Sequence, residues 1–272
     1  MPTLVENHTI EENVALCKRL KLRFIELNMN FPEYQMGSSG DVERLVSAAG
    51  DAGIYYTVHL DESLNIADFN VPVAEAWLET VHRAIGAAKD MLFLRDRFGD
   101  SGLPLTLNMH MNHGVHITLP DRKVCLYERD FARYMQAFMV FRDKCEEWIC
   151  GGDLRIVIEN TDGLLPFERE AIEYLLESPK FGLTWDVGHS KAAGEGDVPF
   201  ILAHQGSLCH FHIHDGTEHP PRNHLALGDG EIDLAERLRL AERLNARCVL
   251  ETKTAAALER SAAYLREIGY SV

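Results

Sequence analysis

The sequence contains no Cys-x-x-Cys pair, although six cysteines are present among its 272 residues. The cysteines are scattered, and several lie inside apolar runs, as expected of reduced side chains that serve packing. We therefore expect neither a disulfide framework nor a thiolate metal site.

Long apolar runs and positive charge are also scarce. No stretch of 18 apolar residues occurs, and residues 1–6 lack the segments of a signal peptide, so we expect a cytoplasmic protein that does not span a membrane. The 27 Lys and Arg are outnumbered by 42 Asp and Glu, which gives a net charge of -15 and disfavours nucleic acid as a partner. A Gly-x-x-x-x-Gly-Lys phosphate loop is absent, so phosphate recognition is unsupported.

The chain instead alternates short β-rich runs with longer amphipathic runs, a pattern typical of parallel βα units. Its length and its 46% of hydrophobic residues suit one large core, and single (β/α)₈ barrels commonly have about 250 residues. The pattern alone does not distinguish a closed barrel from an open sheet. We predict a single-domain (β/α)₈ TIM barrel over residues 1–272, because polar residues follow many strands and would meet at one mouth of a barrel.

Turn and cap signals divide the chain further. Thr9 and Glu12 have the spacing of a capping box at the start of the first helix. Two alternating runs, 115–119 and 124–127, flank a turn and predict a β-hairpin inserted after strand three, which would serve as a lid, as an oligomer contact or as neither. Strands are expected at 22–28, 54–59, 103–110, 154–159, 181–186, 208–214, 224–227 (the weakest pattern) and 247–251, and later helices at 41–52, 73–98, 128–149, 166–177, 198–205, 233–244 and 254–268.

Carboxylates and histidines occur at the ends of the predicted strands. Gathering them in a confined mouth is costly, because like charges and desolvation oppose ionisation, and a divalent cation removes that cost. A mixed carboxylate and imidazole set suits Mn²⁺, Mg²⁺ or Co²⁺, whereas more histidines would favour Zn²⁺. The strand-terminal residues are Glu26, His59, His110, Glu159, Asp186, His212 and Glu251.

Five short motifs, in this order between about residues 20 and 253, carry a family resemblance. They resemble the xylose isomerase-like barrel superfamily, which includes sugar isomerases and epimerases, inosose dehydratases and isomerases, and endonuclease IV. The motifs are Ile158-Glu159-Asn160-Thr161, Asp186-Val187-Gly188-His189, His212-Ile213-His214-Asp215, His224 followed by Gly228-Asp229-Gly230, and Leu250-Glu251-Thr252.

The resemblance implies a metal-dependent isomerase or epimerase of a small polyhydroxy carbonyl compound, such as a sugar, sugar phosphate or inosose. It implies one divalent ion, with Mn²⁺ favoured over Zn²⁺, Co²⁺ or Mg²⁺, and Glu159 and Glu251 as catalytic acid and base. The implied metal ligands are Glu159, Asp186, His212 and Glu251, and the implied substrate-binding residues are His59, His110, His189, His214, Arg222 and His224.

Three alternatives stay open: an endonuclease IV-like zinc nuclease, an inosose-type dehydratase, and a non-catalytic barrel that binds carbohydrate or metal. His59, His110 and Glu159 offer a second metal site of the kind that the nuclease branch uses. A third zinc in that branch needs an aspartate where this chain has Arg222, and the acidic charge balance further disfavours a nuclease. A homo-oligomer is compatible with the sequence.

The remaining polar positions have plainer interpretations. Glu26 is either a core carboxylate or a substrate contact, and His210 is expected to pack inside the barrel. An alternative interpretation of His59 and His110 is that they are buried histidines with satisfied hydrogen bonds. We expect His113, His116 and His219 to be solvated loop residues, and His82 and His204 to lie on helices without a ligand role.

Overall fold

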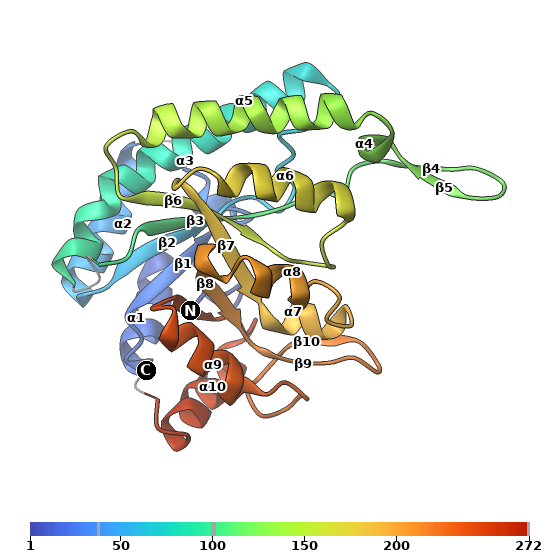
Figure 1. The fold of residues 1–272 in the computed structure, drawn as a ribbon. Helices are drawn as coiled ribbons and strands as arrows, with labels where there is room; N and C mark the ends of the chain where they lie inside the picture. The colour runs from blue at the N-terminus through green and yellow to red at the C-terminus, as the bar shows by residue number, and fades with distance from the viewer. Residues whose placement is uncertain (37–38, 99–101, 271–272) are drawn as a thin grey trace.

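The main sheet contains seven parallel strands and curves into a nearly closed barrel (Figure 1). The computed structural model describes residues 1–36, 39–98 and 102–270. Neighbouring strands follow the order β1-β2-β3-β6-β7-β8-β11, so consecutive βα units lie side by side. Their bounds are β1 (Phe24–Asn28), β2 (Tyr55–His59), β3 (Leu105–His110), β6 (Leu154–Glu159), β7 (Phe181–Asp186), β8 (Leu208–Ile213) and β11 (Arg247–Leu250).

Helices surround the sheet and bury their apolar faces against it (Figure 1). The predicted capping box is present, since the Thr9 side chain accepts the N–H of Glu12 and the Glu12 carboxylate accepts the N–H of Thr9. No helix in the described part of the chain has the length and apolar character needed to cross a membrane. The helices are α1 (Ile10–Leu20), α2 (Ser39–Ala52), α3 (Val71–Arg97), α4 (Leu126–Arg129), α5 (Phe131–Ile149), α6 (Pro166–Leu176), α7 (Val187–Ala192), α8 (Val198–Ala203), α9 (Leu234–Arg243) and α10 (Ala255–Glu267), with 3₁₀ turns at Pro32–Tyr34 and Gln205–Ser207.

The prediction of a barrel strand at 224–227 is wrong. That region contributes to β10 (Arg222–Leu225), which pairs antiparallel with β9 (Asp215–Thr217) outside the main sheet. His224 has a left-handed backbone with φ of 52°, and its N–H donates to Nδ1 of His214 at 2.8 Å. A segment whose backbone bends in this way cannot continue a parallel ladder.

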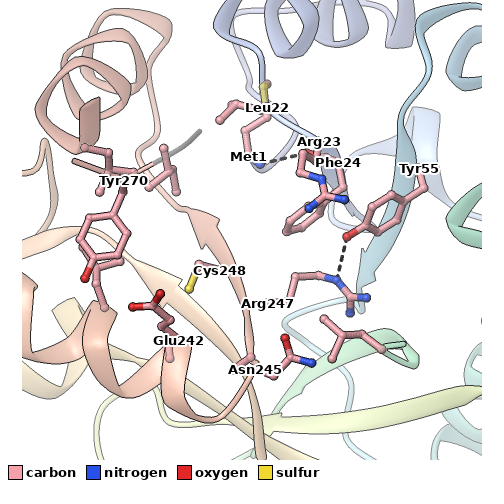
Figure 2. A pocket seen from close by; sticks show the side chains of 16 residues that line it. Met1, Leu22, Arg23, Phe24, Tyr55, Glu242, Asn245, Arg247, Cys248 and Tyr270 are labelled. Carbon is pink, nitrogen blue, oxygen red and sulfur yellow. Dashed lines mark hydrogen bonds between the residues drawn. The ribbon is translucent and has the colours of Figure 1, made fainter. Parts of the chain in front are cut away.

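The N-terminal residues lie along the free edge of β1 instead. Pro2 forms a parallel bridge with Glu26, and the backbone of Glu26 bonds to Met1 and Thr3. Near the start of the strands, a cavity of about 400 Å³ separates this edge from β11 (Figure 2). The buried Arg247 of β11 spans the gap, because its Nε donates to the Tyr55 hydroxyl at 2.9 Å and its guanidinium lies 5.8 Å from the Phe24 ring centroid. Side-chain contacts thus join the two edges where ladder hydrogen bonds are missing.

Two short strands follow β3, where the sequence predicts a hairpin. They are β4 (His116–Thr118) and β5 (Lys123–Cys125), which pair antiparallel. The pair extends away from the barrel (Figure 1), and His116, Ile117 and Thr118 are exposed.

The six cysteines form no disulfides in the structure. Cys17, Cys125 and Cys145 are buried, and Cys209 and Cys248 are partly buried, in line with a packing role. Cys150 is exposed and departs from that expectation.

Burial of an aromatic side chain between α5 and the sheet should contribute strongly to stability. Phe141 is fully buried and packs against Phe181 of β7, with ring centroids 5.7 Å apart. We expect Phe141→Ala to lower the free energy of unfolding by about 3–5 kcal/mol, whereas Phe93→Ala on α3, where Phe93 is 47% exposed, should change it by only about 0.5 kcal/mol. Urea denaturation followed by circular dichroism measures both, and equal losses would contradict this account of the core.

Candidate metal centre

Four side chains from four strand ends converge at the mouth of the barrel. Glu159 ends β6, Asp186 ends β7, His212 lies near the end of β8 and Glu251 follows β11. Nδ1 of His212 lies 3.1 Å from a carboxylate oxygen of Glu159, 3.1 Å from one of Glu251 and 3.7 Å from one of Asp186. One potential ligand atom from each of the four lies within 4.8 Å of all the others, so the structure brings the predicted ligand set together.

The cluster is buried, and its charges control one another. Burial raises the pKa of Glu159, but His212 and His110 outweigh it and hold that pKa well below the ordinary value. Burial likewise raises the pKa of Glu251, and His212 with Lys253 holds it well below the ordinary value. For His212, burial lowers the pKa, while Glu159, Glu251 and Glu26 raise it well above the ordinary value. Positive charge on His212 therefore stabilises the carboxylates of Glu159, Glu251 and Glu26, which would otherwise repel one another.

The donor set fits a divalent cation. Three carboxylates and one imidazole supply oxygen and nitrogen ligands of the kind that such ions take. Oε2 of Glu251 is buried and makes no hydrogen bond among the described residues, although it lies 3.1 Å from Nδ1 of His212, an arrangement that suits two groups that share one cation. Glu159, Asp186, His212 and Glu251 can therefore hold one divalent metal ion.

A second group adjoins the first through Glu159. Nε2 of His110 lies 3.1 Å and Nε2 of His59 lies 3.4 Å from Oε2 of Glu159, and ligand atoms of the three residues meet within 4.8 Å. Nδ1 of His59 donates to the Leu60 carbonyl at 2.8 Å, which fixes the ring with Nε2 toward Glu159. Burial lowers the pKa of His59, but Glu159 raises it further, to about 9. Both histidines line a cavity at the mouth of the barrel, distinct from the one near the start of the strands, and the group has the composition of a second metal site.

His189, His214 and His224 form a third group on the other side of the mouth. His224 donates from Nδ1 to the backbone carbonyl of Glu251 at 3.0 Å, and burial lowers its pKa to about 3, so the ring is neutral. His189 and His224 line the cavity. His214 does not, because it is fully buried with Nε2 2.9 Å from the Asp186 carboxylate and Nδ1 accepting the His224 N–H.

A cavity of about 420 Å³ opens onto these groups, and Glu159 and Glu251 line it. Two further acidic residues, Glu62 and Asp162, also line it, together with Lys253. Arg222, predicted to contact the substrate, is exposed on β10 and does not line the cavity. None of residues 115–126 lines it either, so the lid role of the hairpin stays a prediction.

Three residues that contact the site were not among the site residues predicted from the sequence. Nζ of Lys253 lies 2.7 Å from Oε1 of Glu251, and Asn108 donates to Oε2 of Glu159. His113, expected to be solvated, is half-buried in the cavity wall with Nδ1 2.7 Å from Oε1 of Glu168. Lys253 and Asn108 had a signal in the chain, since each lies two positions from a predicted site residue, Glu251 and His110 respectively.

Two other histidines match their predicted environments, and Glu26 has a defined place. His210 is fully buried inside the barrel, and His219 is exposed. Glu26 is buried against His210 and His212 and does not line the cavity, which supports the core interpretation over a substrate contact.

The sequence matches the model of the xylose isomerase-like TIM barrel family over residues 14–268. The chain therefore belongs to this family. None of the curated proteins compared with it gives a significant match.

Solved structures of sugar epimerases share the fold. The 3-keto-D-glucoside 4-epimerase from E. coli is 14% identical with a TM-score of 0.71, and the match covers 98% of each chain. A D-tagatose 3-epimerase-like protein is 18% identical with a TM-score of 0.69, over 90% of this chain and 88% of its own. A xylose isomerase-like TIM barrel protein from Mycobacterium smegmatis, in complex with magnesium, is 15% identical with a TM-score of 0.64, over 95% and 87%. At these identities the similarity establishes the fold alone.

Gly188 leaves room for the His214 ring behind Asp186. A Cβ at position 188 would overlap that ring, whereas one at Gly196 would meet no atom within 4 Å. We expect Gly188→Ala to displace His214 and to lower the free energy of unfolding by about 1–3 kcal/mol, and Gly196→Ala to leave it nearly unchanged. Thermal unfolding of both variants tests this, and equal stability of Gly188→Ala and the parent would contradict the packing argument.

The His113–Glu168 pair predicts a pH dependence. The hydrogen bond with Glu168 raises the pKa of His113 against the opposing effect of burial, so the pair stabilises the fold most below the ordinary histidine pKa of about 6.5. That contribution is lost as the pH rises through the raised pKa. In Glu168→Gln, which keeps an acceptor for the Leu165 N–H, the His113 pKa should fall and the loss of stability should be larger at pH 6 than at pH 9.

Nuclear magnetic resonance titration of the histidines measures the His113 pKa directly. The exposed His116 serves as the internal control, since its ring signals should be the same in both proteins. An unchanged His113 pKa in Glu168→Gln would show that the carboxylate does not control this ring.

Proposed function

We propose that the protein is a divalent-metal-dependent isomerase or epimerase of a small polyhydroxy carbonyl compound. The observation that carries this proposal is the buried group of Glu159, Asp186, His212 and Glu251 beside a cavity of about 420 Å³, a size that suits a small ligand. The similarity in fold to sugar epimerases is consistent with it. We favour Mn²⁺ as the ion, because oxygen ligands predominate in this group.

A bound divalent ion would polarise a substrate carbonyl and its neighbouring hydroxyl, which acidifies the C–H between them. Glu159 and Glu251 both line the cavity, and each places a carboxylate oxygen 3.1 Å from Nδ1 of His212. Their pKa values lie well below the ordinary value, so both are ionised and able to accept a proton. One glutamate would remove the proton from carbon. The other would first take up a proton from solvent in the open cavity and would then donate it to the opposite face of the same carbon.

Other groups on the wall would orient the substrate. His224 is neutral and held by the Glu251 carbonyl, so its Nε2 can accept a hydrogen bond from a hydroxyl. Lys253 and His189 offer donors from neighbouring positions of the wall. The acidic residues Glu62 and Asp162 and the net charge of -15 favour an uncharged polyol over a phosphorylated or polyanionic substrate.

Two other outcomes share parts of this site. After the same proton abstraction, loss of a β-hydroxyl would give a dehydratase, and the shape of the bound substrate decides between the two. The group formed by His59, His110 and Glu159 favours a second candidate, a zinc nuclease, because it offers a second metal position. Against the nuclease, Arg222 is exposed where that branch has its zinc-binding aspartate.

Removal of either proposed proton carrier tests the function. We expect Glu159→Gln and Glu251→Gln to lower kcat by about 10²–10⁴-fold, because an amide cannot accept the proton. The assay uses purified protein with Mn²⁺ and a panel of D-tagatose, D-psicose, 3-keto-glucosides and inososes, with elemental analysis of the same samples. Glu146→Gln makes the same chemical change at an exposed position of α5 and should keep the parent rate.

If both glutamate variants convert a substrate at the parent rate, the acid and base assignment is wrong. A second assay tests the nuclease alternative. In it, the protein is incubated with Zn²⁺ and a DNA duplex that carries an abasic site. Cleavage of that duplex without turnover of any sugar would replace the epimerase proposal with the nuclease.

A further inference from the structure

A fourth carboxylate lies inside the barrel, behind the proposed metal ligands. Glu26 of β1 is 1% exposed, and three side chains contact it. Thr57 donates its hydroxyl to Oε2 at 3.1 Å, and Nε2 of His210 lies 2.9 Å from the same oxygen. Nε2 of His212 lies 2.9 Å from the other oxygen, Oε1. The three contacts come from β2 and β8, so Glu26 is held from both sides of the barrel interior.

A buried carboxylate is costly unless its partners repay the loss of water. In the described part of the chain, the hydrogen bonds and ion pairs of the Glu26 side chain are all with Thr57, His210 and His212, and none is with lysine or arginine. Packing alone would be served better by an apolar residue at this position. The carboxylate therefore points to a task that involves the two imidazoles.

The two nitrogens of His212 face different groups. Nδ1 points at the carboxylates of Glu159 and Glu251, and Nε2 points at Glu26. A histidine binds a metal ion through a nitrogen lone pair, so its proton must sit on the other nitrogen, usually facing an acceptor. Oε1 of Glu26 is the acceptor in that place.

The contact is short, but its angle is not yet that of a hydrogen bond, and Nε2 of His212 has no hydrogen-bond partner among the described residues. Oε2 of Glu26 is fixed by Thr57 and His210, so the carboxylate is the rigid member of the pair. A modest rotation of the imidazole about its side-chain bonds would align Nε2–H with Oε1. The same rotation keeps Nδ1 directed to the mouth of the barrel.

We propose that Glu26 is a positioning residue for the metal centre. Its carboxylate keeps the proton of His212 on Nε2 and directs the lone pair of Nδ1 to the ion. It also makes Nδ1 a stronger electron-pair donor to the metal. This role rests on the proposed metal centre but not on the identity of the substrate, because it concerns metal affinity. His210 and Thr57 are not among the four proposed ligands, and their contacts hold the carboxylate.

The affinity of the full chain for Zn²⁺ and for Mn²⁺ tests the proposal. Competition with a chromophoric chelator measures it. We expect Glu26→Gln to weaken binding by about 10–100-fold, the range typical of partners that orient a metal-bound histidine. Glu168→Gln is the matched control, since it makes the same chemical change at another fully buried carboxylate that pairs with a histidine, His113, which is not a proposed metal ligand. This variant should bind the ion with an affinity within about threefold of the parent, a much smaller change than the loss expected for Glu26→Gln.

A second measurement does not depend on a variant that folds. In the zinc-loaded parent protein labelled with ¹⁵N-histidine, nuclear magnetic resonance should show His212 protonated at Nε2 and metal-bound at Nδ1. The opposite tautomer would overturn the proposal, as would equal affinities of the parent and Glu26→Gln. An equal loss in Glu168→Gln would assign the effect to the loss of a buried charge in general and overturn the proposal too. A parent protein that binds neither ion would instead remove the metal centre itself, a result distinct from these.

Discussion

Repulsion among three buried carboxylates at the mouth of the barrel is the constraint on which the site depends. Glu159, Asp186 and Glu251 come from separate strands, and the curvature of the sheet brings them around Nδ1 of His212. Burial opposes the charge of Glu159 and Glu251, and the neighbouring positive groups, above all His212, keep both ionised. The imidazole of His212 offsets part of this charge, and a divalent ion would offset more of it while using the same atoms.

The residues around the cluster divide this task. Asn108 and His110 contact Glu159, Lys253 contacts Glu251, and His214 contacts Asp186. Each carboxylate thus has at least one partner apart from His212, which limits the orientations it can adopt. Such pre-orientation reduces the rearrangement required when a ligand binds.

The departure from a regular barrel also belongs to the site. The chain leaves the sheet after β8 and turns back through β9 and β10, where the left-handed backbone of His224 places its ring against the Glu251 carbonyl. A regular strand at this position would not present the ring in this way. The gap between β1 and β11 lies at the opposite end of the barrel from the cluster. There Arg247, at the start of β11, bridges it. The irregular backbone of β9 and β10 thus lies beside the proposed metal ligands.

The sequence by itself determined the parallel βα pattern and the polar ends of the strands. Apolar runs that stop at Glu159, Asp186 and Glu251 indicate both a strand and the direction in which its last side chain is available. Only the tertiary structure decided which polar groups meet. Glu26 and His210 are 184 positions apart, and His113 and Glu168 are 55 apart, so periodicity carries no information about either contact. The backbone of His224 was equally hidden, because its conformation depends on a hydrogen bond to another element and not on its neighbours in the chain.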